Sequence, residues 1–324
     1  MTTIVFGAAG FVGVNIVRQL LLDGEEVIMA DVFEPDKLVW DFLPNQGQGA
    51  KFVFVDTRNR TQVRDAVGAL DIDRAVIAAA LTPLTLDTER DRFLEAVDVN
   101  LVGTVNALDA VRAAGVGRIV FISSETVYGH HDEMTPVTED ISRGKSFSLY
   151  DITKYAGEAL CLRYAEIHGL DLVSARLCAP YGPMERDNGS RPVTSLPALL
   201  VREAREGRPL RLPAQEIPDR AHVFDVAAAV SALLFAQELS HRTYNVGAGR
   251  PVTGDDIAAA VQKIYGERPV ERLPVDPQSR LLHGVLVTDR LEADTGWRPQ
   301  FDIDSGVAQY ADWVEACQHR INRP

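Results

Sequence analysis

Apolar and polar positions follow two alternating periodicities over the first 177 residues. Short apolar runs rich in β-branched residues are separated by stretches in which apolar residues recur at helical spacing. This alternation is typical of a parallel sheet with crossover helices. We expect strands at Thr3–Phe6, Glu26–Ala30, Lys51–Val55, Arg74–Ala78, Arg118–Ser123 and Asp171–Leu177.

Three long helices are expected between these strands, over residues 11–22, 93–114 and 148–167. Glycine follows shortly after each of them, as is common where helices end. Six strands in this rhythm predict an α/β fold, a Rossmann-type doubly wound parallel sheet of order 3-2-1-4-5-6 over residues 1–177.

The rhythm stops after Leu177. Seven prolines fall within residues 178–221, together with one clear helix at 196–206. A helix at 225–237, a strand at 243–246 and a helix at 305–317 follow. We expect residues 178–324 to form mainly a smaller substrate-binding region, with residues 222–248 returning to the first domain.

A glycine-rich turn lies between the first strand and the first helix. Its glycines are Gly7, Gly10 and Gly13, with Phe11 and Val12 opening the helix. Glycines permit a tight turn and close approach of a pyrophosphate, which then faces the free N–H groups of a helix N-terminus. Alone, the pattern also fits an ordinary tight turn.

The end of the second strand adds a carboxylate, Asp31, 18 residues after Gly13. A carboxylate there can accept both hydroxyls of an adenosine ribose. No Arg or Lys follows in residues 32–35, so a 2′-phosphate would meet only negative charge. The sequence therefore predicts NAD rather than NADP as cofactor.

Tyr150 and Lys154 are four residues apart and share one helix face. An ammonium beside a phenol favours the phenolate. It therefore lowers the pKa of the tyrosine towards the range in which a general base works. Such a pair is common on solvated helices. Here, however, it follows a strand that ends in Ser123 and Ser124, at the sheet edge where ligands bind.

Composition narrows the class of protein. The 324 residues are 46% apolar and 24% charged, which is typical of a folded globular chain. With 33 basic and 46 acidic residues the net charge is −13, so we expect no nucleic-acid or membrane partner. Three scattered cysteines predict neither disulfides nor a metal site. We expect a cytoplasmic protein, since no signal peptide or apolar membrane span is evident.

Together these motifs resemble the extended short-chain dehydrogenase/reductases, the NAD-dependent epimerase/dehydratase superfamily. The resemblance runs nearly end to end, through later segments at 180–183, 222–227, 244–247 and 295–299. The residues that carry it are Gly7-x-x-Gly10-x-x-Gly13, Asp31, Asp56, Asn100, Ser124 and Tyr150-x-x-x-Lys154.

The resemblance implies catalytic roles for three residues: Ser124 would hold the reacting oxygen, Tyr150 would exchange its proton, and Lys154 would bind the nicotinamide ribose and tune Tyr150. Further cofactor contacts are implied for Asp56, Thr57, Ala78, Ala79, Ala80 and Cys178. Asn100 is counted with this cofactor set, as the residue that joins helix and active site. Thr82, Ser124, Glu125, Thr126, Arg191 and Arg280 are expected to line the substrate site.

The sequence departs from the family at three informative positions. Thr126 stands where dehydratases carry a catalytic carboxylate, which speaks against elimination of water. Ala179 and Pro218 stand where nucleotide-sugar epimerases supply an amide and an arginine to a diphosphate. Four arginines could replace them, but we expect each to be a solvated surface charge: Arg186, Arg191, Arg220 and Arg280.

The favoured hypothesis is therefore an NAD-dependent oxidoreductase acting on a small polyhydroxylated, sugar-like substrate without a nucleotide diphosphate. Two alternatives stay open: a nucleotide-sugar epimerase with the same hydride chemistry, and a catalytically silent NAD-binding regulator. Helix 93–114 is apolar over much of its circumference. We expect a homodimer through helices 93–114 and 148–167.

Overall fold

The structure is a computed structural model that describes residues 1–131, 135–145, 148–186, 194–214, 219–274 and 284–317. Seven parallel strands form one sheet in the order β3-β2-β1-β4-β5-β7-β11. Their bounds are β1 Thr2–Phe6, β2 Glu26–Asp31, β3 Ala50–Phe54, β4 Arg74–Ile77, β5 Arg118–Ser124, β7 Asp171–Leu177 and β11 Thr243–Val246. The predicted six-strand order is confirmed, and β11 extends it by a seventh strand.

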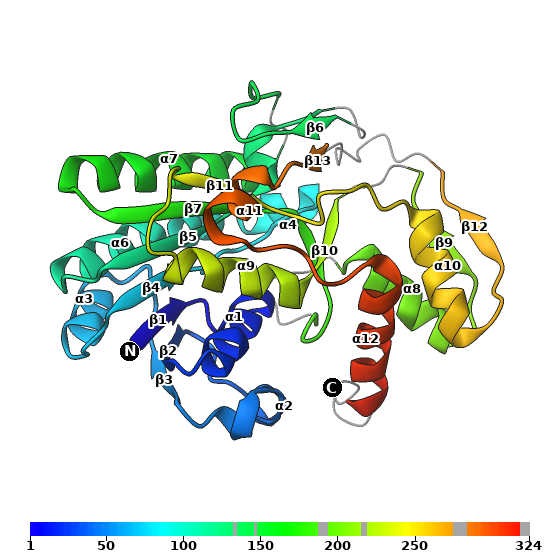
Figure 1. The fold of residues 1–324 in the computed structure, drawn as a ribbon, viewed down its shortest axis with the longest axis horizontal. Helices are drawn as coiled ribbons and strands as arrows, with labels where there is room; N and C mark the ends of the chain where they lie inside the picture. The colour runs from blue at the N-terminus through cyan, green and yellow to red at the C-terminus, as the bar shows by residue number, and fades with distance from the viewer. Residues whose placement is uncertain (132–134, 146–147, 187–193, 215–218, 275–283, 318–324) are drawn as a thin grey trace.

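Helices cover both faces of this sheet (Figure 1). One face carries α1 (Phe11–Leu22) and α9 (Val223–Phe235), whose apolar side chains share one core with the strands. The other face carries α3 (Arg60–Gly68), α6 (Thr104–Ala113) and α7 (Leu149–His168), over a second core.

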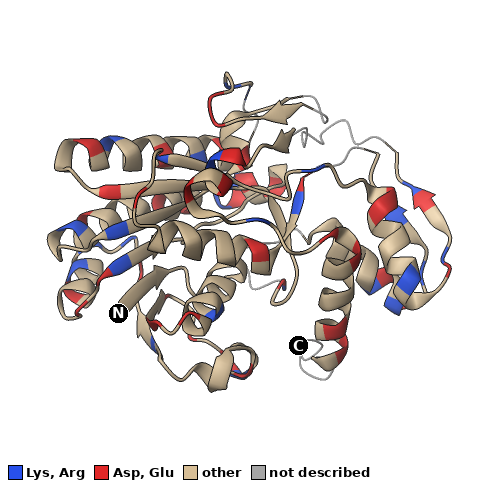
Figure 2. Cartoon of the chain, in the orientation of Figure 1, with Lys and Arg blue, Asp and Glu red and all other residues tan. Residues whose placement is uncertain are grey.

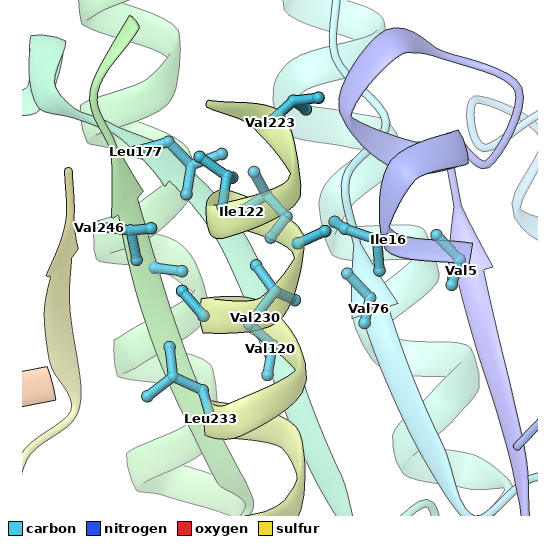
Figure 3. Close-up of a cluster of buried hydrophobic side chains, with 14 of the residues drawn as sticks. Val5, Ile16, Val76, Val120, Ile122, Leu177, Val223, Val230, Leu233 and Val246 are labelled. Carbon is cyan, nitrogen blue, oxygen red and sulfur yellow. The ribbon is translucent and has the colours of Figure 1, made fainter. Parts of the chain in front are cut away.

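The first core shows how a late segment of the chain returns to the sheet. Val223, Val230 and Leu233 of α9 lie over the sheet beside Val120 and Ile122 of β5 (Figure 3). Full burial of such a side chain contributes about 1.5–3 kcal/mol. The packing of α9 therefore fixes the adjoining strand β10 (Arg220–His222) at the carboxyl end of the sheet.

The sequence predicts one helix over 93–114, and the structure divides it. Helix α5 (Phe93–Val97) runs into a π-helical turn, η2 (Asp98–Gly103), before α6 begins. Thr104, the first residue of α6, donates its hydroxyl to the carbonyl of Asn100 in this turn at 2.8 Å. Such turns are frequent at functional sites, and the buried Asn100 lies within this one.

A smaller group of elements lies beside the carboxyl end of the sheet, on the right in Figure 1. Helices α8 (Leu196–Arg205), α10 (Gly254–Tyr265) and α12 (Ile303–Ala316) pack there around a third core. The strand pairs are β8 (Ala179–Tyr181) with β10, β9 (Leu210–Leu212) with β12 (Val270–Arg272), and β6 (Pro136–Val137) with β13 (Val285–Leu286). The remaining helices are α2 Lys37–Phe42, η1 Pro44–Gly47, α4 Leu86–Asp91, η3 Glu125–Tyr128 and α11 Asp289–Thr295.

Acidic and basic residues are interspersed along the ribbon (Figure 2). The negative net charge therefore arises from a general excess of acidic side chains. Among the described helices, none is both long enough and apolar enough to cross a membrane.

Candidate active site

The turn between β1 and α1 depends on glycine at two positions. Gly7 has a φ of +80°, and a Cβ there would lie 2.6 Å from the Ala79 amide nitrogen. A Cβ on Gly13 would lie 2.0 Å from the Gly7 carbonyl oxygen. Helix α1 starts next to this turn without a side-chain cap and without an acidic residue in its first turn. Its N–H groups therefore suit a phosphate ligand.

Asp31 fixes the turn against the end of β2. One carboxyl oxygen accepts a hydrogen bond from the Ala9 N–H at 2.9 Å, and the other accepts from the Phe33 N–H at 3.1 Å. Burial raises the pKa of this carboxyl, and the backbone N–H groups oppose that effect. The carboxyl therefore stands at the wall of the same cavity as the glycine turn.

Asp56 and Asn100 have partners that the sequence does not reveal. Arg58 donates to both oxygens of the Asp56 carboxylate, at 2.9 and 2.8 Å, and this hydrogen bonding lowers the pKa of Asp56. Asn100 is buried and holds both backbone groups of Leu81, at 2.8 and 3.0 Å, while its amide also donates to Thr153. Asn100 thus joins the strand-four loop to α7.

The catalytic candidates come from β5 and α7. Ser124 ends β5, and its hydroxyl accepts from the Thr126 N–H at 3.3 Å. Ser148 caps α7, in a reciprocal pair of hydrogen bonds with Asp151, which lies in the first turn of the helix beside Tyr150. Packing of α7 beside β5 then places Tyr150, Lys154 and Ser124 on the wall of one cavity.

Lys154 is almost fully buried, with 4% of the residue exposed. Its ammonium donates to the Ile122 carbonyl at 2.5 Å and lies 4.7 Å from the centre of the Phe121 ring. Burial lowers the pKa of this ammonium to about 8, although the nearby Cys161 and Glu158 oppose the effect. The group is therefore cationic at neutral pH and costly to keep so.

The cavity that unites these groups has a volume of about 800 Å³. Every predicted site residue in the described part of the chain lines it, with the exception of Asn100. The Asn100 side chain binds Leu81 and Thr153, which agrees with its expected role of joining helix and active site. Arg191 and Arg280 lie outside the described residues.

The structure places two of the predicted surface arginines, Arg220 and Arg186, in different environments. The expectation that Arg220 is a solvated surface charge is wrong: it is 8% exposed and lines the cavity. Its strand β10 pairs with β8, directly after the buried Cys178. Arg186 instead donates to Asp36 at 2.6 Å and does not line the cavity.

Two further cavity residues come from segments that carry no sequence motif. Arg211 of β9 is held by the fully buried Glu203 carboxylate at 2.6 Å. Glu89 of α4 accepts from the Leu149 N–H at 2.6 Å and so closes the cavity beside the start of α7. Each of these two charged residues stands among apolar neighbours, as is common in surface helices and strands. The sequence therefore does not indicate that either residue lines the cavity.

A glycine-rich phosphate turn at the edge of a doubly wound sheet, with Ser124, Tyr150 and Lys154 beside it, defines a dinucleotide-dependent hydride-transfer enzyme. The family model for "NAD dependent epimerase/dehydratase family" matches residues 3–247. The chain belongs to this family, an extended short-chain dehydrogenase/reductase family, and NAD is its cofactor. The predicted family, fold class and cofactor are therefore confirmed.

Individual relatives share the whole length of the chain at low identity. A UDP-glucose 4-epimerase of Pisum sativum is 25% identical over 96% of this chain and 95% of its own. A UDP-glucuronate 4-epimerase of Thermodesulfobacterium geofontis is 22% identical over 96% and 95%. The solved UDP-glucose 4-epimerase of Thermus thermophilus, in complex with NAD, has a TM-score of 0.82 at 29% identity, covering 97% and 99% of the two chains.

Proposed function

We propose that this protein is an NAD-dependent sugar epimerase that oxidises a secondary alcohol transiently and restores it with inverted configuration. The observation that carries the proposal is the convergence of Ser124, Tyr150 and Lys154 on the cavity that the glycine turn also lines. The family membership supports the same chemistry, and the named relatives favour epimerisation over net oxidation.

In this proposal each residue acts on the reacting hydroxyl or on its base. Tyr150 removes the hydroxyl proton and later returns it, while Ser124 holds the oxygen in place. The buried Lys154 ammonium stabilises the Tyr150 phenolate and thereby makes the tyrosine a stronger acid at neutral pH. Bound NAD supplies the acceptor for the hydride of the same carbon. Asp31 would receive the adenosine ribose, and the turn at Gly7 and Gly13 its pyrophosphate.

The substrate is proposed to be a nucleotide sugar. Ala179 and Pro218 favoured a substrate without a nucleotide diphosphate, because they replace two groups that related epimerases use to bind a diphosphate. Two relatives that span this chain are nonetheless UDP-sugar 4-epimerases. The cavity also contains Arg220, which lies two residues after Pro218 in the chain. These observations favour the alternative over the free sugar that the departures indicate.

The proposal is tested by incubating the NAD-loaded enzyme with UDP-glucose, UDP-galactose, UDP-glucuronate and UDP-galacturonate. We expect interconversion of a 4-epimer pair without net accumulation of NADH. Tyr150→Phe should lower turnover by about 10²- to 10⁴-fold while NAD binding is kept, as removal of a general acid–base group does. Tyr155→Phe is the matched control, since this exposed tyrosine of the same helix stacks on Arg143 and keeps its ring.

Two outcomes would contradict the proposal. Normal turnover by Tyr150→Phe would remove Tyr150 from the chemistry. Stoichiometric formation of NADH with a polyol or sugar, without epimer formation, would replace the epimerase by a dehydrogenase that uses the same residues.

We further propose a homodimer through the outer faces of α5–α6 and α7. These neighbouring helices expose large apolar side chains in the single chain, among them Phe93, Leu94, Val102, Ile152 and Leu160. Exposed apolar faces of this kind mark interaction sites. Light scattering should give twice the chain mass of 35.5 kDa, and Leu94→Glu should shift it towards the monomer. A monomeric wild type at micromolar concentration would refute the dimer.

A further inference from the structure

An ion pair that the proposed chemistry does not use is buried behind the catalytic residues. Glu158 lies on α7, four residues after Lys154, and is 3% exposed. Arg176 lies on β7, where the register places it opposite Ser123 of β5, and its side chain is 13% exposed. Neither Glu158 nor Arg176 lines the cavity. Any effect of this pair on the reaction must therefore act through other residues.

Both oxygens of the Glu158 carboxylate bind to β7. Arg176 donates to Oε1 through Nη2 at 2.6 Å and to Oε2 through Nε at 3.0 Å. Ser174, two residues earlier on the same strand, donates its hydroxyl to Oε2 at 2.6 Å. A planar contact between guanidinium and carboxylate restricts orientation as well as distance. The ion pair therefore fixes α7 to β7 at a defined position.

The remaining nitrogen of the guanidinium reaches the segment that follows Ser124. Arg176 Nη1 donates to the Tyr128 hydroxyl at 2.9 Å and to the Glu139 carbonyl at 3.1 Å. Tyr128 ends the short helix η3, which begins directly after Ser124, and its ring centre lies 4.7 Å from Arg176 Cζ. One buried cation thus connects the helix of Lys154 to the segment of Ser124.

The catalytic groups of α7 depend on how this helix lies against the sheet. Glu158 comes one turn after Lys154, so the two side chains share a helix face. Lys154 donates to the Ile122 carbonyl of β5, the strand that ends in Ser124. If α7 slid or turned against β5, this hydrogen bond would break and Tyr150 would move relative to Ser124. The ion pair opposes such a movement, because it fixes α7 to the strand beside β5.

Glu158 also acts on Lys154 through its charge. Burial lowers the pKa of the Lys154 ammonium, whereas Cys161 and Glu158 of the same helix raise it. A buried carboxylate needs a partner of opposite charge, and Arg176 supplies it. Glu158 thereby favours the cationic form of Lys154, which is the form that stabilises the Tyr150 phenolate.

We infer that Glu158 and Arg176 are positioning residues, which hold Lys154 and Ser124 in the relative arrangement that the reaction requires. The inference rests on the proposed function, in which Ser124 and Tyr150 act on the same hydroxyl. A displacement of about 1 Å can cost a catalytic site about a hundredfold in rate. Loss of the pair should therefore slow the reaction while substrate binding is kept, because neither residue belongs to the cavity wall.

The test removes both charges together. Replacing a buried ion pair by apolar side chains of similar volume is often neutral for stability, whereas removing one partner leaves an unpaired buried charge. We therefore combine Glu158→Leu with Arg176→Met and assay the NAD-loaded enzyme. We expect cooperative unfolding as in the wild type, a kcat about tenfold to hundredfold lower, and a KM for the nucleotide sugar within about threefold. In a folded variant, loss of a merely structural pair would leave kcat unchanged.

A second measurement needs no substrate. Phenolate absorbance follows the ionisation of Tyr150, taken as the difference between each protein and the same protein with Tyr150→Phe. In the double variant Tyr150 should ionise at a pH higher by about one unit or more, because Lys154 is displaced and has lost the support of the Glu158 charge.

Two further variants separate positioning from a general effect on the fold. Arg176→Lys keeps a charge beside Glu158 but lacks the planar fork that also reaches Tyr128, so its kcat should lie between those of the wild type and the double variant. The matched control combines Arg118→Met with Asp171→Leu, which removes an ion pair between β5 and β7 at the opposite ends of these strands. Its kcat should equal that of the wild type.

A folded double variant with the kcat of the wild type, or with unchanged ionisation of Tyr150, overturns the inference. If the double variant does not fold, Tyr128→Phe decides, since it removes only the hydroxyl that Arg176 binds near Ser124. A kcat lower by about threefold or more then supports the inference, as loss of one hydrogen bond predicts, and an unchanged kcat overturns it. Failure of the proposed function is seen separately, as the absence of epimer formation from any nucleotide sugar by the wild type. The ionisation of Tyr150 still tests the ion pair in that case.

Discussion

Replacing Lys154 by methionine should change how the stability of the nucleotide-free protein against unfolding depends on pH. The residue is 4% exposed, and burial lowers the pKa of its ammonium from 10.5 to about 8. Each pKa unit corresponds to about 1.4 kcal/mol, so holding the proton in the folded state costs about 3 kcal/mol at neutral pH. Methionine has a similar length and no proton to hold.

The sign follows from proton binding. Between about pH 8 and 10.5 the folded state has lost the Lys154 proton while the unfolded chain still binds it, so the stability of the wild type rises with pH in this window. Relative to Lys154→Met, the wild type should therefore gain about 2 kcal/mol between about pH 7 and about pH 9.5. Loss of the hydrogen bond to Ile122 in the variant is a cost common to both pH values.

Denaturant unfolding of both proteins at the two pH values measures this difference. Lys37→Met is the control, since Lys37 is an exposed partner of Asp41 and such pairs contribute within about 0.5 kcal/mol. The reasoning is refuted if the free energy of unfolding of the wild type, relative to that of Lys154→Met, stays constant or falls as pH rises. We also expect the variant to be inactive, because methionine has no ammonium to stabilise the Tyr150 phenolate.

Two further predictions concern the cofactor end of the cavity. Gly13→Ala places a Cβ 2.0 Å from the Gly7 carbonyl oxygen, so the turn must shift and we expect a titration to show loss of NAD binding. Gly68→Ala is the control: its Cβ meets open space, so this variant should bind NAD normally. The wild type should bind NAD at least about tenfold more tightly than NADP, a difference of about 1.4 kcal/mol, and Asp31→Ser should narrow this gap. Equal affinities of the wild type for the two dinucleotides would contradict the role given to Asp31.

Much of the cofactor half could be predicted because its signals are local. The glycine turn, the carboxylate at the end of β2 and the Tyr–Lys spacing on one helix face each depend on a few neighbouring residues. Repetition of strand and helix then restricts the sheet to few topologies, since parallel crossovers have one hand. This restriction made the strand order predictable, and the structure confirms it.

The substrate half was less accessible, because burial there depends on contacts between distant segments. Arg220 lies in a three-residue strand within a proline-rich stretch, and nothing in its neighbours distinguishes it from a surface arginine. The family resemblance implied that Asn100 joins helix and active site, but its partners Leu81 and Thr153 are visible only in the folded chain.

The sequence by itself thus predicted the fold class and the cofactor from periodicity and short motifs, and its resemblance to the family supplied the roles of the candidate catalytic trio. Tertiary structure alone decided which charged groups share the cavity wall. Packing of α9 on the sheet fixes β10, and β10 places Arg220 beside Glu125 although the two are far apart in the chain. The energy of a charge depends on what surrounds it in space, so its role appears only when the chain is folded.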